Sequence, residues 1–221
     1  MGAPPVGEAG PGPPHRRLRL LGLDRSGPPP PETLADHPLR PLTIPNAIGY
    51  LRAALIPVFL VLAYGNDSHG GVDTGAAIAF FAAGILDYAD GLAARMTGQY
   101  SRLGALLDPI VDRALVIGGV AVCWSYELLP RWALALLLAR ELVMLVVGQM
   151  WLRRGLELKI NWYGRIAVGP TMLGIFLGLV GLRTLGEIWL YAGLSLALVA
   201  TVQYYRDGMA QLRERRASSS A

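Results

Sequence analysis

Charged side chains are scarce in this chain. Asp, Glu, Lys and Arg make up 16% of its 221 residues, whereas hydrophobic residues make up 53%, and this balance is unusual for a soluble fold. The one cysteine, Cys123, lies in an apolar run. A single chain with one cysteine can form neither a disulfide framework nor a CxxC metal site, so we expect Cys123 to pack in a core. The composition favours an integral membrane protein.

The chain also lacks a basic patch. Its net charge is +4 and its pI is about 9.5, values that would suit a nucleic-acid-binding protein if the basic residues were clustered. They lie instead between apolar stretches. That distribution argues against a nucleic-acid partner and is typical of topology signals at the ends of membrane spans.

The amino-terminal segment is rich in glycine and proline, with Pro28 to Pro31 consecutive. Such segments bury too little apolar surface to fold, so we expect residues 1–41 to form a disordered or extended cytoplasmic tail. Within it, Arg16–Leu21 combines arginines with leucines. This stretch could rest on anionic headgroups or could be a solvated basic segment. Its apolar part is too short for a secretory signal.

Six later stretches are long and apolar enough to cross a bilayer, which takes about 20 helical residues because the hydrocarbon is about 30 Å thick. They lie near Thr43–Tyr64, Thr74–Met96, Leu103–Tyr126, Pro130–Leu152, Trp162–Leu182 and Leu185–Tyr205. Backbone groups in lipid must pair internally, so the expected fold is an all-α polytopic membrane protein. We expect six transmembrane helices over residues 42–206 and a basic cytoplasmic tail over 207–221.

Lysine and arginine predict the orientation of these spans. Most of the 20 such residues fall in the first tail, the second and fourth loops and the carboxyl terminus, and basic loops concentrate on the cytoplasmic side. We therefore expect both termini in the cytoplasm of a plasma-membrane protein. Arg52, Arg113 and Arg140 fall inside predicted spans, where a charge needs a partner or a polar cavity.

Four aspartates stand at the cytoplasmic ends of the second and third predicted spans. Asp87 and Asp90 are three residues apart and Asp108 and Asp112 are four apart, so each pair shares one helix face. A short loop should bring the two faces together. Four carboxylates repel one another, and hard divalent cations suit such an all-oxygen cluster. His69 is predicted on the opposite side, which argues against zinc. The pattern predicts a site for a metal-bound diphosphate.

Small residues accompany the aspartates. Gly91, Ala94 and Gly104 fall on or beside the same helix faces, where a missing side chain admits either a bulky ligand or a neighbouring helix. A second set, Gly174, Gly178 and Gly181, could pack against another copy of the chain or within it.

From Asp87 to Asp112 the sequence reads D-x2-D-G-x2-A-R-x8-G-x3-D-x3-D. In this segment it resembles the signature of the CDP-alcohol phosphotransferases, at the positions Asp87, Asp90, Gly91, Ala94, Arg95, Gly104, Asp108 and Asp112. All eight fixed positions match, and the resemblance extends to the six-span plan over about Leu42 to Tyr205.

The resemblance implies a role for each matching residue. Mg²⁺ or Mn²⁺, as two ions, would be held by Asp87, Asp90, Asp108 and Asp112. Asp112 would also be the general base on the acceptor hydroxyl. The CDP moiety would be bound by Gly91, Ala94, Arg95 and Gly104. The implied partners are CDP-diacylglycerol, a small alcohol or phospholipid acceptor and membrane lipids, and a homodimer is common among such proteins.

The acceptor alcohol is indicated by weaker signals. Arg113, Arg140, Lys159 and Arg165 are basic candidates for binding an acceptor phosphate. Arg140 could instead pair with Glu141 or an aspartate, and Lys159 could serve topology alone. Thr43–Asn46 with Arg52, Leu107–Pro109 and Ala139–Glu141 resemble the branch that makes phosphatidylglycerophosphate or cardiolipin. Arg113 and Ile166–Pro170 depart from that branch. We expect glycerol 3-phosphate as the acceptor, with phosphatidylglycerol as the alternative.

Two other classes also place aspartates in a membrane. Prenyltransferases hold a diphosphate through motifs closer to N-D-x2-D-x3-D, and this chain has Gly91, Ala94 and Arg95 after its first aspartate pair instead. A transporter or proton relay has no need of the glycine and alanine spacing. A non-enzymatic scaffold leaves the aspartates unexplained. The sequence therefore favours the phosphatidyltransferase.

Overall fold

The structure is a computed structural model that describes residues 41–65, 72–153 and 162–219, with side chains at 41–65, 72–150 and 166–211. The expected tail up to residue 40, including Arg16–Leu21, lies outside the described residues, as do His69 and Lys159.

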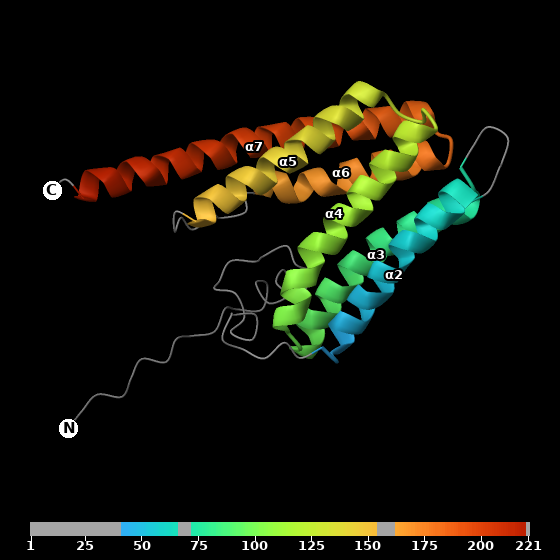
Figure 1. Ribbon diagram of the computed structural model, residues 1–221, viewed down its shortest axis with the longest axis horizontal. Helices are drawn as coiled ribbons and strands as arrows, with labels where there is room; N and C mark the ends of the chain where they lie inside the picture. Colours follow the sequence, from blue (N-terminus) through green and yellow to red (C-terminus); the bar gives the residue numbers. More distant parts are fainter. Residues whose placement is uncertain (1–40, 66–71, 154–161, 220–221) are drawn as a thin grey trace, which may run out of the picture. The chain divides into compact units, whose positions relative to one another are not determined.

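The described chain is all-helical. Its helices, coloured from blue to red in Figure 1, are α2 (Ile44–Gly65), α3 (Thr74–Thr97), α4 (Arg102–Ser125), α5 (Arg131–Arg153), α6 (Trp162–Leu179) and α7 (Arg183–Ser219). Each overlaps one of the six predicted apolar stretches. The all-α prediction is confirmed. Apolar stretches form helices because each helix satisfies its own backbone polar groups.

Two helix ends differ from the predicted spans. α6 stops at Leu179, three residues before the predicted Leu182, because Gly181 turns the chain with a φ of 83°. The Leu182 amide then donates to the Leu177 carbonyl at 2.9 Å, an arrangement that caps the last helical turn. α7 is longer than its predicted span, because the helix continues past Tyr205 to Ser219 without a break.

Four of the described helices are long and apolar enough to cross a membrane. They are Ile44–Gly65, Thr74–Thr97, Arg131–Met150 and Arg183–Gln211. α4 carries Arg102, Asp108, Asp112 and Arg113 in its first half, which lowers its apolar character. The apolar stretch of α6 with described side chains, Ile166–Leu179, is shorter than a full span.

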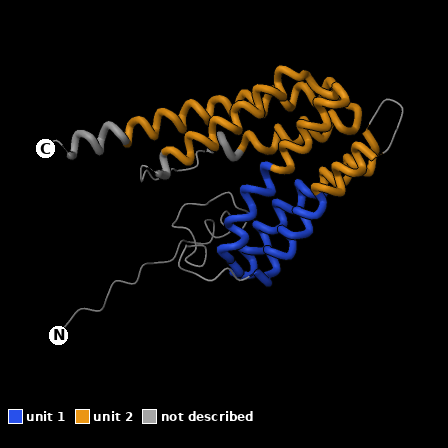
Figure 2. The backbone as a smooth tube through the Cα atoms, viewed as in Figure 1, with its two compact units in different colours: residues 1–55, 82–113 blue, residues 56–81, 114–221 orange. Residues whose placement is uncertain are grey.

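The chain divides into two compact units, each of which contains parts of α2, α3 and α4 (Figure 2). In unit 1, residues 41–55 and 82–113 are described. Unit 2 comprises residues 56–81 and 114–221. The core of unit 2 contains Phe59 and Phe80, whose ring centroids lie 5.4 Å apart, and the fully buried Cys123. Cys123 is therefore a packing residue, as expected.

Glycines let α6 and α7 approach closely within unit 2. A Cβ atom on Gly174 would lie 2.6 Å from the Leu190 amide nitrogen, and one on Gly193 would lie 2.6 Å from the Thr171 nitrogen. The Leu129 side chain occupies the space that a Cβ atom on Gly178 would take. Gly174 and Gly178 thus serve packing within the chain, which was one of the two alternatives left open by the sequence.

Gly174→Ala tests this close approach. The added methyl group would meet backbone atoms of α7, which cannot rotate away, so we expect the free energy of unfolding to fall by about 1–3 kcal/mol. Gly169→Ala on the same helix is the matched control, because a Cβ there meets nothing within 4 Å. Thermal unfolding in detergent should separate the two variants, and equal midpoints would contradict the packing described.

Candidate functional site

A short connection joins the two helices that carry the sequence motif. α3 ends at Thr97, and Gly98 follows with a φ of 66°, a conformation that glycine adopts without strain. The side chain of the next residue, Gln99, accepts a hydrogen bond from the Ile44 amide at 3.1 Å. The connection between α3 and α4 is thereby attached to the first turn of α2.

A second attachment lies beside it. The buried Ser101 hydroxyl donates to Asn46 Oδ1 at 2.8 Å and accepts from the Gly104 amide at 3.0 Å. Ser101 therefore caps the start of α4 while holding α2. A Cβ atom on Gly104 would lie 2.7 Å from Asn46 Oδ1. The requirement for glycine at position 104 is thus explained by the neighbouring helix.

The motif aspartates of both helices meet a buried arginine. Arg52 of α2 is 2% exposed, and its Nη1 lies 2.6 Å from Asp87 Oδ1 on α3. Its Nη2 forms an ion pair with Asp112 Oδ1 on α4. The two carboxylates are about half exposed, at 45% and 50%. One guanidinium group therefore joins three helices at the aspartates.

Asp90 and Asp108 complete this group. Asp90 is 8% exposed, and its Oδ2 is buried without a hydrogen-bond partner among the described residues. Asp87 and Asp108 both repel the Asp90 carboxylate, whereas Arg52 attracts it. Asp108 is exposed, is repelled by Asp112 and is attracted by Arg52. We name the four carboxylates of Asp87, Asp90, Asp108 and Asp112 the aspartate cluster, because each of them repels at least two of the others.

The donor chemistry of the cluster suits a hard divalent cation. All four side chains offer carboxylate oxygens, and a buried oxygen without a hydrogen bond, such as Asp90 Oδ2, calls for a partner. Over the ranges that the structure describes, no three His, Cys, Asp or Glu side chains are already arranged to hold an ion. One oxygen each of Asp87 and Asp112 is instead bound by Arg52.

The residues proposed to bind the CDP moiety lie on the same two helices. A Cβ atom on Gly91 would lie 3.2 Å from Nη1 of Arg95, so the Arg95 side chain extends back along α3 over Gly91. Ala94 lies on α3 and is partly buried. All of them belong to unit 1 together with Gly104. Their roles in nucleotide binding stay predictions.

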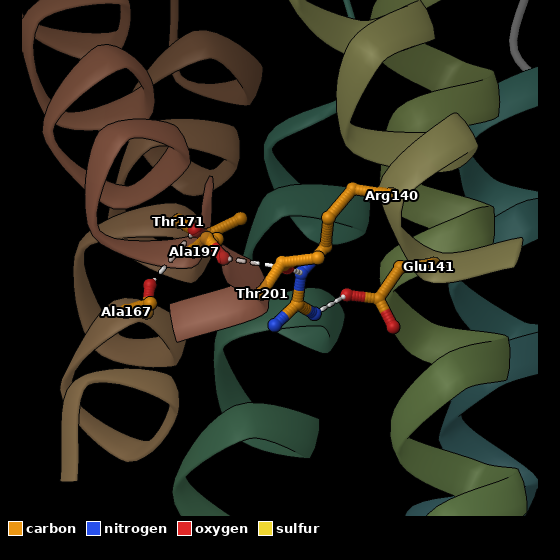
Figure 3. A network of polar contacts seen from close by, with 6 residues as sticks. All are labelled: Arg140, Glu141, Ala167, Thr171, Ala197 and Thr201. Carbon is orange, nitrogen blue, oxygen red and sulfur yellow. Dashed lines mark hydrogen bonds and ion pairs between the residues drawn. The ribbon is translucent and has the colours of Figure 1, made fainter. Parts of the chain in front are cut away.

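The candidates for acceptor binding fall in different places. Arg113 is partly buried on α4, one residue after Asp112. Arg140, in unit 2, forms an ion pair with Glu141 and donates from Nε to Thr201 Oγ1 at 3.2 Å (Figure 3). Pairing of Arg140 with Glu141 was one of the alternatives left open by the sequence, and it is the one observed. For Arg165 the structure describes only the backbone, which is part of α6. Lys159 lies outside the described residues.

Three functional candidates were not identified from the motif alone. Arg52 was expected to need a partner, but its partners could not be named. Asn46 was included only in the Thr43–Asn46 pattern, and Ser101 was not singled out. Asn46 lies in the first turn of one apolar stretch, and Ser101 lies just before another. Polar residues at these two positions are the signal that could have indicated a contact between the two helices.

Comparison with known proteins extends the resemblance beyond the motif. A sequence profile described as CDP-alcohol phosphatidyltransferase matches residues 42–202. A CMP-forming cardiolipin synthase of Streptomyces coelicolor is 39% identical over 131 residues, which cover 58% of this chain and 60% of that protein. An Escherichia coli protein named CDP-diacylglycerol--glycerol-3-phosphate 3-phosphatidyltransferase is 30% identical over 166 residues, which cover 72% of this chain and 87% of that protein.

Mycobacterial relatives show the same pattern. Proteins of Mycobacterium tuberculosis and Mycobacterium bovis, named provisionally as cardiolipin synthases, are 37% identical over 136 residues. The match covers 61% of this chain and 63% of each relative. The chain therefore spans less than two thirds of the length of these relatives.

A double-mutant cycle tests the attachment between α2 and α4. Asn46→Ala and Ser101→Ala should each lower the free energy of unfolding, the serine variant by about 0.5–2 kcal/mol because it also loses the helix cap. Since both remove the same hydrogen bond, the double variant should cost about 0.5–1.5 kcal/mol less than the two singles together. Unfolding in detergent measures this, with the exposed Ser195→Ala as a control. Strict additivity would contradict the contact.

Proposed function

The chain belongs to the CDP-alcohol phosphatidyltransferase family, and we propose that it transfers the phosphatidyl group of CDP-diacylglycerol to a glycerol-type acceptor, with release of CMP. The observation that carries this proposal is the aspartate cluster, gathered around Arg52 from the two helices of the motif. Carboxylate and phosphoryl oxygens are both negative and repel one another. The aspartate cluster can therefore bind a phosphoryl group only through cations that lie between them.

Divalent metal ions serve this family in general. We assign Mg²⁺ or Mn²⁺, as two ions, to the carboxylate oxygens of Asp87, Asp90, Asp108 and Asp112. When bound, such ions neutralise the diphosphate oxygens and stabilise the charge that develops on the departing CMP. Asp90 supports this assignment best, because its Oδ2 is already buried without a hydrogen bond from the described residues.

The protein's own groups account for the remaining chemistry. The acceptor oxygen attacks the phosphorus that bears the diacylglycerol, a new P–O bond forms, and the P–O bond to CMP breaks. Asp112 takes the hydroxyl proton. Its carboxylate is half exposed, and Arg52 holds Oδ1. Gly91, Ala94, Arg95 and Gly104 bind the nucleotide end.

The substrate also explains a site within apolar helices. CDP-diacylglycerol keeps its acyl chains in lipid while its nucleotide reaches water, so the phosphates lie near the membrane boundary. We propose that all six described helices span the plasma membrane, with both termini and the aspartate cluster on the cytoplasmic side. Charges on α4 are then accommodated where the aspartate cluster meets water.

Two glycerol-type acceptors are candidates. Glycerol 3-phosphate, the acceptor in the name of the Escherichia coli relative, would give phosphatidylglycerophosphate. Phosphatidylglycerol would give cardiolipin, and the higher identity of the Streptomyces coelicolor relative favours this second candidate. The pairing of Arg140 with Glu141 points the same way, because that arginine is already engaged and a phospholipid acceptor needs fewer basic ligands.

A direct assay tests the reaction. The purified protein with Mg²⁺ or Mn²⁺ should release CMP from CDP-diacylglycerol only when an acceptor is supplied, and chelation of the metal should abolish release. Lipid chromatography after incubation with glycerol 3-phosphate, phosphatidylglycerol, inositol phosphate or serine identifies the product. Phosphatidylinositol phosphate as the one product would overturn the glycerol-type assignment.

Asp112→Asn tests the general base. The amide cannot take the hydroxyl proton, so kcat should fall by about 10²–10⁴-fold while the affinity for CDP is retained within about threefold. Turnover and nucleotide binding in detergent measure the two effects. Asp207→Asn, an exposed aspartate on α7, is the control and should keep wild-type turnover. An active Asp112→Asn enzyme would exclude this residue as the base.

A further inference from the structure

Arg52 is the most completely buried charged side chain in the part of the chain that the structure describes. It is 2% exposed, yet its guanidinium group reaches carboxylates on two other helices, Asp87 on α3 and Asp112 on α4. A buried cation of this kind is tolerated only with partners of opposite charge. Arg52 is therefore committed to the aspartates of the proposed reaction.

The contact has a specific form. Separate nitrogens, Nη1 and Nη2, bind the Oδ1 atoms of Asp87 and Asp112. The planar fork of an arginine can hold two carboxylates in fixed directions, whereas lysine presents a single point charge on a flexible stem. The second oxygen of each half-exposed carboxylate is not bound by Arg52. Arg52 thus determines which oxygen of each carboxylate can meet a ligand.

The charge of Arg52 acts on the whole cluster. It attracts Asp90 and Asp108 as well as its two direct partners. These same carboxylates repel one another, so the guanidinium lowers the free energy of keeping them close together. A fixed positive charge at this place also opposes the binding of a second cation to the same oxygens, because like charges repel.

We propose that Arg52 is a positioning residue and a built-in counter-ion: it orients Asp87 and Asp112 for turnover, and it weakens the affinity of the aspartate cluster for divalent cations. The part that concerns turnover rests on the proposed function. The part that concerns cation affinity does not. Loss of the charge should therefore change metal binding and catalysis in opposite directions, an outcome that a purely structural role for Arg52 does not produce.

Two variants separate orientation from charge. Arg52→Lys keeps the charge but loses the two-armed contact, and Arg52→Gln loses both. Free Mn²⁺ measured by electron paramagnetic resonance gives the dissociation constant in detergent, independently of activity, and CMP release gives kcat and KM. Arg131→Gln is the matched control, because Arg131 is half exposed and pairs with Glu127 in unit 2. Thermal unfolding confirms that each variant is folded.

For Arg52→Gln we expect the Mn²⁺ dissociation constant to fall by about threefold or more. Its kcat should fall by roughly 10–100-fold, with KM for CDP-diacylglycerol within about threefold of wild type. Arg52→Lys should lose at least about tenfold in kcat while keeping Mn²⁺ affinity within about twofold. The control should match wild type in every measurement.

Each contrary result overturns one of three claims: the counter-ion role, the positioning role or the proposed function. Weaker or unchanged Mn²⁺ binding in a folded Arg52→Gln protein overturns the counter-ion role, as does a wild-type protein that binds no Mn²⁺. A fully active Arg52→Lys enzyme overturns the positioning role, and this variant decides the question if Arg52→Gln does not fold. Wild-type protein that binds Mn²⁺ but never releases CMP overturns the proposed function and leaves the counter-ion role standing.

Discussion

Charge compensation around Arg52 is the constraint on which unit 1 of this protein depends. Four carboxylates at the end of two apolar helices repel one another, and a guanidinium in a poorly hydrated place is equally unfavourable alone. Opposite charges offset this cost in part, because one side chain of α2 pairs with Asp87 on α3 and Asp112 on α4. The position of α2 is therefore tied to the chemistry through a charge, and three helices must agree in register for the contact to form.

Local backbone chemistry makes that register possible. Gly98 turns the chain after α3, and Ser101 caps α4 while it binds Asn46 of α2. Because Gly104 has no side chain, Asn46 can lie against α4 at this point. The glycine of the motif at position 104 is then accounted for by packing between α2 and α4, independently of the ligand role proposed for it. One short loop aligns the helix ends, and the arginine fixes the carboxylates a few turns further along.

Much of this architecture could be predicted from the sequence, for identifiable reasons. Long apolar stretches have few alternatives to helices, and the eight-position motif from Asp87 to Asp112 indicates the family by itself. The partners of Arg52 could not be predicted, because they are distant in sequence and only the packing of α2 brings them together. The end of α6 depended on the positive φ of Gly181, which hydrophobicity does not reveal.

The length of α7 exceeds what is needed to cross a bilayer. Its 37 residues make a rod of about 55 Å at 1.5 Å per residue, whereas the hydrocarbon of a bilayer is only about 30 Å thick. A helix of this length that crosses a bilayer at the usual tilt therefore extends beyond the hydrocarbon. The sequence of the final portion of α7 includes Arg206, Arg213, Arg215 and Arg216, and basic residues that follow a membrane span are attracted to anionic lipid headgroups.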